Sequence, residues 1–195
     1  MNRLRRSEGK GAVFLDRDGT IVRQVELLHR IDELKILPSS SKAIRLLNER
    51  GIPVFVVTNQ PVVARGILNE EQVRLINDEM KRRLAKKGAH IDAVYFCPHH
   101  PDATLEQYRV KCACRKPEPG MILEAAQEHE IDLRQSIMIG DTTQDVEAGR
   151  RAGVRTVLVE TGHGGKDPWQ YTAVPDWKAK NLLEAVQKWL TVVSQ

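Results

Sequence analysis

The chain has 195 residues, of which 41% are hydrophobic and 29% are charged. This balance excludes an intrinsically disordered chain, and the length fits one domain with a single buried core. The formal net charge is +4, from 30 Lys and Arg against 26 Asp and Glu. So small an excess does not by itself indicate nucleic-acid binding. No apolar stretch approaches the roughly 18 residues of a membrane span, and no apolar signal segment follows the basic start, so we expect a cytoplasmic protein with no membrane partner.

Four basic residues stand among the first ten: Arg3, Arg5, Arg6 and Lys10. A polyanion-binding arm is one interpretation of them. We favour a short solvated tail, because chain termini are usually loosely held. We therefore expect a flexible N-terminal tail over residues 1–10 and a single domain over residues 11–195.

Short β-branched runs alternate along the chain with longer amphipathic segments, which is typical of a parallel sheet covered by helices. Each predicted strand is short and apolar, as a strand buried on both faces is. The expected fold class is therefore α/β with a central parallel sheet. In chain order, the predicted strands cover residues 12–16, 54–58, 93–97, 136–140 and 154–160.

Helical periodicity fills most of the segments between these strands. Asn69 and Gln72 form the pattern of a capping box at the start of one helix, and Gly88 ends it. Residues 97–119 are different, because they lack periodicity and hold four prolines. A loop of this length inside a compact domain usually has a specific function. Another predicted helix begins after the serines at 39–41 and runs to Arg50. Three more are predicted over residues 120–130, 142–152 and 176–193.

Aspartates follow two of the predicted strands directly. The first strand runs into Asp16 and Asp18, and the fourth runs into Asp141, with Asp145 four residues later. Ligands gather at the carboxyl ends of parallel strands, so these side chains are expected in one crevice. Each aspartate alone is also a common cap or turn residue. Together they would repel one another unless a hard cation lay between them, and oxygen ligands in this number suit magnesium.

Polar side chains at other strand ends agree with this interpretation. Thr58, Asn59 and Gln60 end the second strand and can donate to phosphoryl oxygens, although Thr and Asn also simply terminate strands. Arg115 and Lys116 supply fixed positive charge just before a helix. In phosphoryl transfer, cations are expected to stabilise the negative charge that develops in the transition state. One carboxylate could then act as nucleophile and a neighbouring one as general acid and base.

These motifs together resemble the four motifs of the haloacid dehalogenase superfamily. They stand in the same order as in that family and span about residues 16 to 145. The resemblance implies a Rossmann-like three-layer sandwich and a phosphatase that forms an aspartyl-phosphate, which makes the chain a phosphoric monoester hydrolase. The matching residues are 16–20, 58–60, Lys116 with Pro117, 140–141 and Asp145.

The same resemblance implies roles for individual residues. Asp16 is expected to attack phosphorus, and Asp18 to protonate the leaving oxygen and then to activate water. Thr58 and Lys116 are expected to hold the transferring phosphoryl group. The implied magnesium ligands are Asp16, the main-chain carbonyl of Asp18, and Asp141. Asp145 is expected to support Asp141 rather than to bind the metal.

The three cysteines and a histidine form a second candidate metal site. Cys97 and His99 are followed, after twelve residues, by Cys112 and Cys114. Three thiolates and one imidazole complete the tetrahedral shell of structural zinc, and clustered cysteines in a cytosolic protein favour metal over disulfide. Buried free thiols, or a redox pair at Cys112 and Cys114, are the alternatives. His100 is the rival fourth ligand, but its side chain should point the other way in an extended segment.

The zinc loop resembles one subgroup of the superfamily, which holds D-glycero-D-manno-heptose 1,7-bisphosphate 7-phosphatases and histidinol-phosphate phosphatases. Residues 97–101 and 112–121 carry the resemblance, together with residues 64–66. Members lack a large cap domain, so short loops would choose the substrate. Residues 24–27 keep none of the substrate loop of the heptose enzymes, and residues 61–63 also depart from the usual turn.

The leading hypothesis is a sugar-phosphate phosphatase of carbohydrate metabolism that acts on a small phosphate ester, with heptose 1,7-bisphosphate as the first substrate to test. Asn59, Gln60, Arg65 and Arg115 are the candidate substrate contacts, and His29 and His163 are weaker ones. Histidinol phosphate is the alternative substrate, with Glu26 as a faint indication of a cationic ligand. A polynucleotide 3′-phosphatase and a non-catalytic phosphosugar-binding protein are less favoured, because no aromatic-rich basic groove is evident and both Asp16 and Asp18 are present. No obvious interface is seen, so we expect a monomer.

Overall fold

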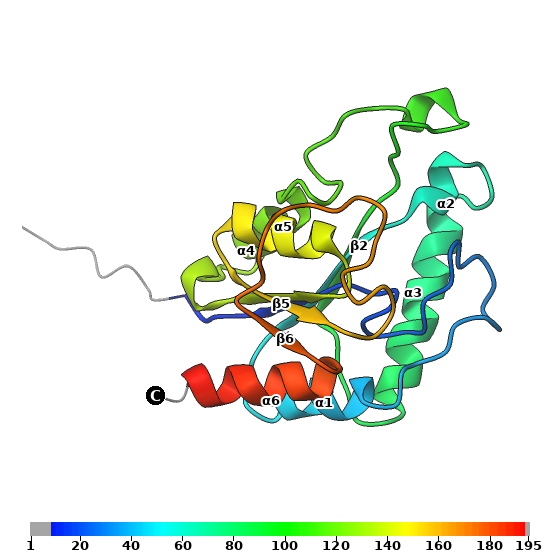
Figure 1. The fold of residues 1–195 in the computed structure, drawn as a ribbon. Helices are drawn as coiled ribbons and strands as arrows, with labels where there is room; N and C mark the ends of the chain where they lie inside the picture. The colour runs from blue at the N-terminus through cyan, green and yellow to red at the C-terminus, as the bar shows by residue number, and fades with distance from the viewer. Residues whose placement is uncertain (1–8, 194–195) are drawn as a thin grey trace, which may run out of the picture.

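The computed structural model describes residues 9–193, so the flexible tail expected over residues 1–10 falls almost entirely outside the described residues. The described residues form a six-stranded sheet with the strand order β3-β2-β1-β4-β5-β6, and every neighbouring pair is parallel (Figure 1). The strands are β1 (Val13–Leu15), β2 (Val54–Asn59), β3 (Ala93–Cys97), β4 (Ile137–Gly140), β5 (Arg155–Val159) and β6 (Trp177–Ala179). The predicted α/β class is confirmed.

Helices follow most of the strands, as expected of right-handed parallel connections. The short α2 was not predicted, because four residues are too few for a helical period. The helices are α1 (Ser40–Asn48), α2 (Pro61–Ala64), α3 (Glu70–Ala85), α4 (Gly120–Glu128), α5 (Thr143–Ala152) and α6 (Leu182–Val193), with 3₁₀ turns η1 (Glu106–Tyr108) and η2 (Leu133–Gln135).

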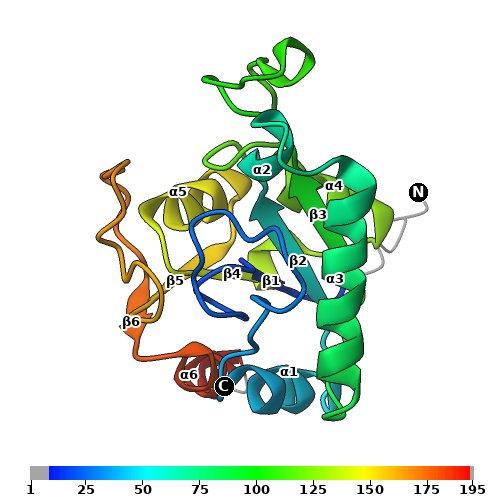
Figure 2. The same ribbon diagram turned by 90° about the vertical axis from the view of Figure 1, so that its right-hand side faces the viewer.

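The sheet lies between two helical layers (Figure 2). The core on one side joins the sheet to α1, α3 and α6, and the core on the other side joins it to α4 and α5. Strand β1 shows why: Val13 and Leu15 face the first core, whereas Phe14 faces the second, where it stacks on Phe55 with ring centroids 5.6 Å apart. A strand with both faces buried has no polar position, which explains its continuous apolar run.

The helix starts are set by side-chain caps. The predicted capping box at Asn69 and Gln72 is confirmed, with both reciprocal hydrogen bonds present. A second capping box joins Thr142 and Asp145 at the start of α5, and Gly153 ends that helix with a φ of 78°. This capping box therefore places Asp145 in the first turn of α5, beside the end of β4.

The helix predicted over residues 176–193 was wrong in its first part, where the chain forms β6 before α6. Asp176 exchanges hydrogen bonds with Thr156, and Trp177 pairs with Val157. These contacts to β5 override the helical spacing of the apolar residues and make β6 the edge strand, which the sequence alone does not reveal.

Two further features concern the outline of the molecule. The segment between β3 and α4, drawn in green, extends away from the sheet above α2 (Figure 1). No helix within residues 9–193 is long and apolar enough to cross a membrane.

Candidate active site

Aspartates gather at the carboxyl ends of two adjacent strands. Asp16 follows β1 and Asp141 follows β4, and these strands pair directly. Asp145 lies one turn into the helix after β4. One carboxylate oxygen of each of the three lies within 4.8 Å of the others, and all three side chains are buried. The crevice expected at this edge of the sheet is therefore present.

Lys116 lies among these carboxylates and is only 3% exposed. Its Nζ donates to Oδ1 of Asp16 at 2.7 Å and to the carbonyl oxygen of Val57 at 2.8 Å, and it pairs with Oδ1 of Asp145 at 2.6 Å. Burial alone would lower the pKa of Lys116, but the attraction of Asp145 and Asp16 raises it above its usual value. The lysine is therefore a permanent cation at the floor of the site.

The side chains of Asn59 and Gln60 hold other site residues in place. Asn59 donates to the carbonyl oxygen of Lys116 at 3.0 Å and accepts from its backbone N–H at 3.0 Å. Gln60 donates to Oγ1 of Thr58 at 2.9 Å and to Oδ2 of Asp18 at 3.0 Å. Both residues were expected to contact substrate, and both border the cavity. Their amides, however, are already bonded within the protein.

Asp141 is fully buried at 0% exposure. Its Oδ2 accepts from the backbone N–H of His163 at 2.7 Å, whereas Oδ1 has no partner among the described residues. Burial, followed by repulsion from Asp16 and Asp145, raises the pKa of Asp141 to about 9. Gly162 packs directly on it, since a Cβ there would lie 2.1 Å from Oδ2.

The same causes act on Asp16. Burial raises the pKa of Asp16 to about 7, while Lys116 opposes the shift. Repulsion from the carboxylates of Asp145 and Asp18 adds to it. Two buried carboxyls with raised pKa values and one unpartnered buried oxygen fit a divalent cation. Such an ion supplies positive charge next to the carboxylates and takes their oxygens as ligands. The residues therefore fit magnesium.

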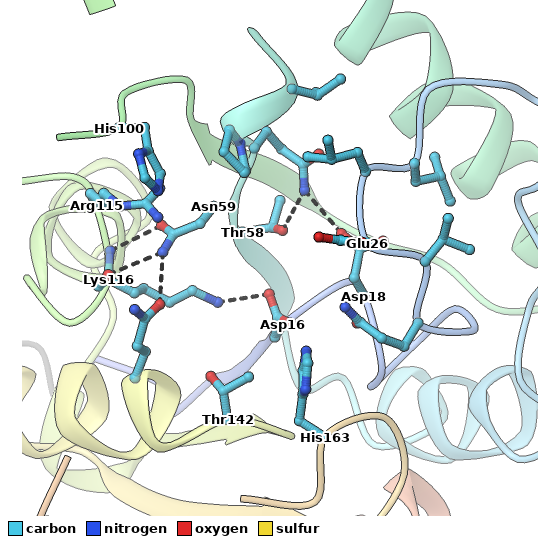
Figure 3. A pocket seen from close by; sticks show the side chains of 18 of the residues that line it. Asp16, Asp18, Glu26, Thr58, Asn59, His100, Arg115, Lys116, Thr142 and His163 are labelled. Carbon is cyan, nitrogen blue, oxygen red and sulfur yellow. Dashed lines mark hydrogen bonds and ion pairs between the residues drawn. The ribbon is translucent and has the colours of Figure 1, made fainter. Parts of the chain in front are cut away.

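A cavity of about 530 Å³ opens above these residues. Figure 3 shows His100 and Arg115 at one side of it and Asp18 and Glu26 at the other, with Asp16 between them. The divergent residues 24–27 border the cavity, as do Leu28, Arg65 and His163. His29 does not border it and bonds instead to Leu27.

The loop after β5 contributes a further part of the cavity lining, through Pro168 and Trp169. Asp167, which is fully buried, ties this loop to the start of α5. Its carboxylate accepts from the backbone N–H of Thr143 at 2.6 Å and from the hydroxyl of that residue at 2.5 Å. These two hydrogen bonds hold the loop so that Trp169 borders the cavity, with its side chain 45% exposed.

The candidate zinc site lies at the end of β3. The Sγ atoms of Cys97, Cys112 and Cys114 are 3.1, 3.2 and 3.6 Å apart, and Nδ1 of His99 is 3.5 Å from Cys114. All four donor atoms lie within 4.8 Å of one another, and three thiols with one imidazole are a donor set of structural zinc, so the cluster fits zinc. His100 instead accepts from the backbone N–H of Asp102 and borders the cavity.

Sequence reasoning missed several residues that organise the site. Arg17 was quoted within a motif but given no role, although its buried guanidinium contacts Asp18. Asp167 and Trp169 stand in an irregular loop with no spacing signal. Gln144 accepts from Asn59 at 3.2 Å, and Asn77 on α3 contacts Arg17. The run of three charged residues after the fully buried β1, with Arg17 in its middle, is the one signal that points to Arg17.

Comparisons with known proteins agree with this geometry. A family model described as "HAD-hyrolase-like" matches residues 113–185. A D-glycero-beta-D-manno-heptose-1,7-bisphosphate 7-phosphatase of Photorhabdus laumondii is 46% identical over 157 residues, which cover 80% of this chain and 84% of that one. The corresponding alpha-specific enzyme of the same organism is 38% identical, with 80% and 85% covered.

A solved structure is also similar. The D,D-heptose 1.7-bisphosphate phosphatase from B. bronchiseptica, complexed with magnesium and phosphate, has a TM-score of 0.82 and 34% identity. The match covers 93% of this chain and 99% of that one. The fold and the site thus define a phosphoryl-transfer hydrolase built on a parallel α/β sheet. The chain belongs to the haloacid dehalogenase-like hydrolase family. It is a phosphoric monoester hydrolase whose buried aspartates fit magnesium and whose Cys₃His cluster fits structural zinc.

Proposed function

We propose that this phosphatase removes the 7-phosphate of D-glycero-β-D-manno-heptose 1,7-bisphosphate. The observation that carries the proposal is a carboxylate–lysine floor beneath a cavity with cationic side chains at one side. The two relatives from P. laumondii are named as 7-phosphatases of the β and of the α anomer of heptose 1,7-bisphosphate. The β anomer is favoured because the beta-specific enzyme of P. laumondii is 46% identical and the alpha-specific one 38%.

In this proposal Asp16 is the nucleophile. A carboxylate oxygen of Asp16 forms a bond to phosphorus as the bond from phosphorus to the sugar oxygen breaks. Asp18 gives its proton to that leaving oxygen. Asp18 then takes a proton from water, whose oxygen attacks phosphorus and releases inorganic phosphate and free Asp16. Lys116 and Thr58 neutralise and bind the phosphoryl oxygens throughout.

Magnesium would be held by Asp16, the main-chain carbonyl of Asp18, and Asp141. When bound, it offsets the carboxylate charge and draws electron density from the phosphoryl group. Asp145 pairs with Lys116 and accepts from Thr142, so we assign it to holding the lysine rather than to the metal.

The distal phosphate would bind at the cationic side of the cavity. Arg65, Arg115 and His100 border this side, and Arg115 is fixed by a 2.9 Å hydrogen bond to the carbonyl oxygen of His99. An arginine held in this way offers a rigid fork for a phosphate. The same charges disfavour histidinol phosphate, whose amine is a cation, although Glu26 on the other side keeps that alternative testable.

The remaining expectations belong to the same proposal. We infer a monomeric, single-domain enzyme over residues 11–195 that acts on a small molecule and not on nucleic acid. A reducing cytoplasm suits a site that needs three free thiols to bind zinc. The cysteines are unpaired by disulfides, which agrees with that setting.

Initial-rate phosphate release, with magnesium, tests the substrate. Both anomers of heptose 1,7-bisphosphate and histidinol phosphate are compared at equal concentrations. We expect kcat/KM on the β bisphosphate to exceed that on histidinol phosphate by about a hundredfold or more, which corresponds to about 2.7 kcal/mol of differential transition-state binding. Equal or poor rates on all three would reject the substrate and leave the phosphatase chemistry standing.

Asp16→Asn tests the chemistry separately. The amide has nearly the same shape but cannot attack phosphorus, so turnover should fall below about a hundredth of wild type while the thermal transition remains cooperative. Surviving activity above that level would exclude Asp16 as the nucleophile.

A further inference from the structure

Arg17 is a buried cation placed between the two aspartates of the first motif. Its side chain is 1% exposed, and it ranks among the largest fully buried side chains of the described residues. A guanidinium cannot lose its charge in a protein, so burying one requires compensating partners. The mechanism proposed above assigns no role to Arg17.

The guanidinium bonds to three different side chains. Nε and Nη2 donate to Oδ2 of Asp18 at 3.0 and 2.8 Å. Nη2 also donates to Oε1 of Gln60 at 2.8 Å, and Nη1 donates to Oδ1 of Asn77 at 2.9 Å. Asn77 lies on α3 and is itself buried, so the arginine is anchored at its far side by a helix.

These contacts make the two oxygens of Asp18 unequal. Oδ2 accepts from two nitrogens of Arg17 and from Nε2 of Gln60. Oδ1 is buried and has no hydrogen-bond partner among the described residues. A proton on Oδ2 would point at three N–H donors, whereas a proton on Oδ1 meets none.

We propose that Arg17 is a positioning residue that holds Asp18 by Oδ2 and so reserves Oδ1 for the proton that Asp18 transfers. The inference rests on the proposed role of Asp18 and deepens it. Arg17 touches neither the phosphoryl group nor the leaving oxygen; it acts through the orientation of Asp18. The link from Asn77 makes α3 the outer support of this proton donor.

Leaving groups of different basicity test the proposal. Cleavage of a sugar phosphate releases an alkoxide that needs a proton, whereas p-nitrophenyl phosphate releases a stable phenolate that does not. Proton donation contributes about 10² to 10⁴ in rate. Arg17→Met should therefore lower kcat/KM on the sugar bisphosphate by about a hundredfold or more, and on p-nitrophenyl phosphate by less than about tenfold. Equal losses on both esters, or no loss on either, would overturn the proposal.

Additional variants separate this inference from the proposed function. Asp18→Asn should show the same selective loss in kcat/KM, which reports formation of the aspartyl-phosphate and not its later hydrolysis by water. Arg17→Met added to it should cause little further loss of kcat/KM on the sugar ester, because both changes remove the same proton donation. If Asp18→Asn lowers kcat/KM equally on both esters, the proposed role of Asp18 as proton donor is wrong. If Asp18→Asn is selective and Arg17→Met is not, only the inference fails.

Two milder changes cover the case in which Arg17→Met does not fold. Arg17→Lys keeps the charge and should recover part of the activity on the sugar ester. Asn77→Ala removes the outer anchor and should give a smaller loss with the same selectivity. Arg82→Met is the control on the same helix, since Arg82 is an exposed partner of Glu79, and it should leave both rates unchanged. An unselective effect of Asn77→Ala and no recovery in Arg17→Lys would contradict the proposal.

Discussion

At the scale of single residues, the carboxylate of Asp141 is surrounded more tightly than its chemistry alone requires. A Cβ on Gly162 would lie 2.1 Å from its Oδ2 and 2.6 Å from Cα of Gly19. Gly162 also has a φ of 62°, and the next residue, His163, donates its backbone N–H to the same Oδ2. The glycine therefore sets how closely the loop after β5 approaches Asp141, the proposed magnesium ligand.

We predict that Gly162→Ala lowers activity at least about tenfold, because the methyl group displaces a metal ligand; the positive φ adds about 1 kcal/mol of strain. Gly51→Ala is the matched control. Gly51 has a similar φ of 64°, but a Cβ there meets nothing within 4 Å. It should lose comparable stability and keep full activity. Magnesium-dependent rates and thermal melts of both variants check this, and equal activity in the two would contradict it.

The aspartates were predictable because they follow strands, where an apolar run ends in a charge that a buried strand does not need. The residues that position them were not. Asn77 is one polar residue on an otherwise ordinary helix, and Asp167 lies in a loop without periodicity. Their partners are 60 and 24 residues away in the chain, so only the folded arrangement reveals them.

At the scale of elements, the zinc cluster joins the end of β3 to the segment that carries Lys116. Cys97 is the last residue of β3, and Cys114 precedes Arg115 and Lys116. Both cations reach the cavity from this short segment. A zinc ion bound by this cluster would therefore hold the segment that carries both cations.

Cys112→Ser should lose most of the zinc, lower the melting temperature and reduce kcat/KM, because Arg115 and Lys116 are no longer held. Metal analysis of purified protein should find about one zinc per wild-type chain. His100→Gln is the matched control, since it neighbours His99 but should keep the metal. A zinc content that is unchanged in Cys112→Ser would argue against the site.

The loop after β5 gives a second prediction at this scale. Thr143→Val keeps the shape of the side chain but removes the hydroxyl bonded to Asp167, so the loop that carries Trp169 should loosen. We expect KM for the sugar bisphosphate to rise about three- to tenfold with little change in kcat, as for a loss of uniform binding. Thr172→Val, an exposed change in the same loop, should leave both constants unchanged. A fall in kcat at constant KM would contradict this assignment.

The sequence predicts most elements of the sheet to within about two residues, because buried parallel strands and capped helices carry strong local signals. β6 was missed because its pairing with β5 is a tertiary contact. The short α2 was missed because it lacks a period. Loop conformations that shape the substrate cavity carry no such signal at all.

At the scale of the whole molecule, the buried carboxylates make stability depend on pH. The pKa values of Asp16 and Asp141 are raised to about 7 and about 9 by burial, whereas both groups ionise near their ordinary pKa of 3.8 when unfolded. Between these values the folded state binds more protons than the unfolded state. The free energy of unfolding of the magnesium-free protein therefore falls as the pH rises through this window.

Magnesium should reverse this trend, because it binds the deprotonated folded site. We predict that the melting temperature without magnesium falls between about pH 5 and pH 8, and that the increase produced by magnesium grows over the same range. Differential scanning fluorimetry with zinc retained measures both. Asp141→Asn should flatten the pH dependence and weaken the magnesium effect. A magnesium effect that is largest at acid pH would refute the account.

The strand order has a consequence for how the protein is made. β1 precedes the other strands in the chain but lies inside the sheet, between β2 and β4. While the chain leaves the ribosome, β1, β2 and β3 can pair in order, yet Lys116 follows Asp16 by 100 residues and the fourth strand comes later still. A nascent chain that ends before β4 therefore has Asp16, the proposed nucleophile, but lacks Asp141, a proposed magnesium ligand. Magnesium and substrate can stabilise only the finished protein, and the early part of the chain must fold on its hydrophobic core alone.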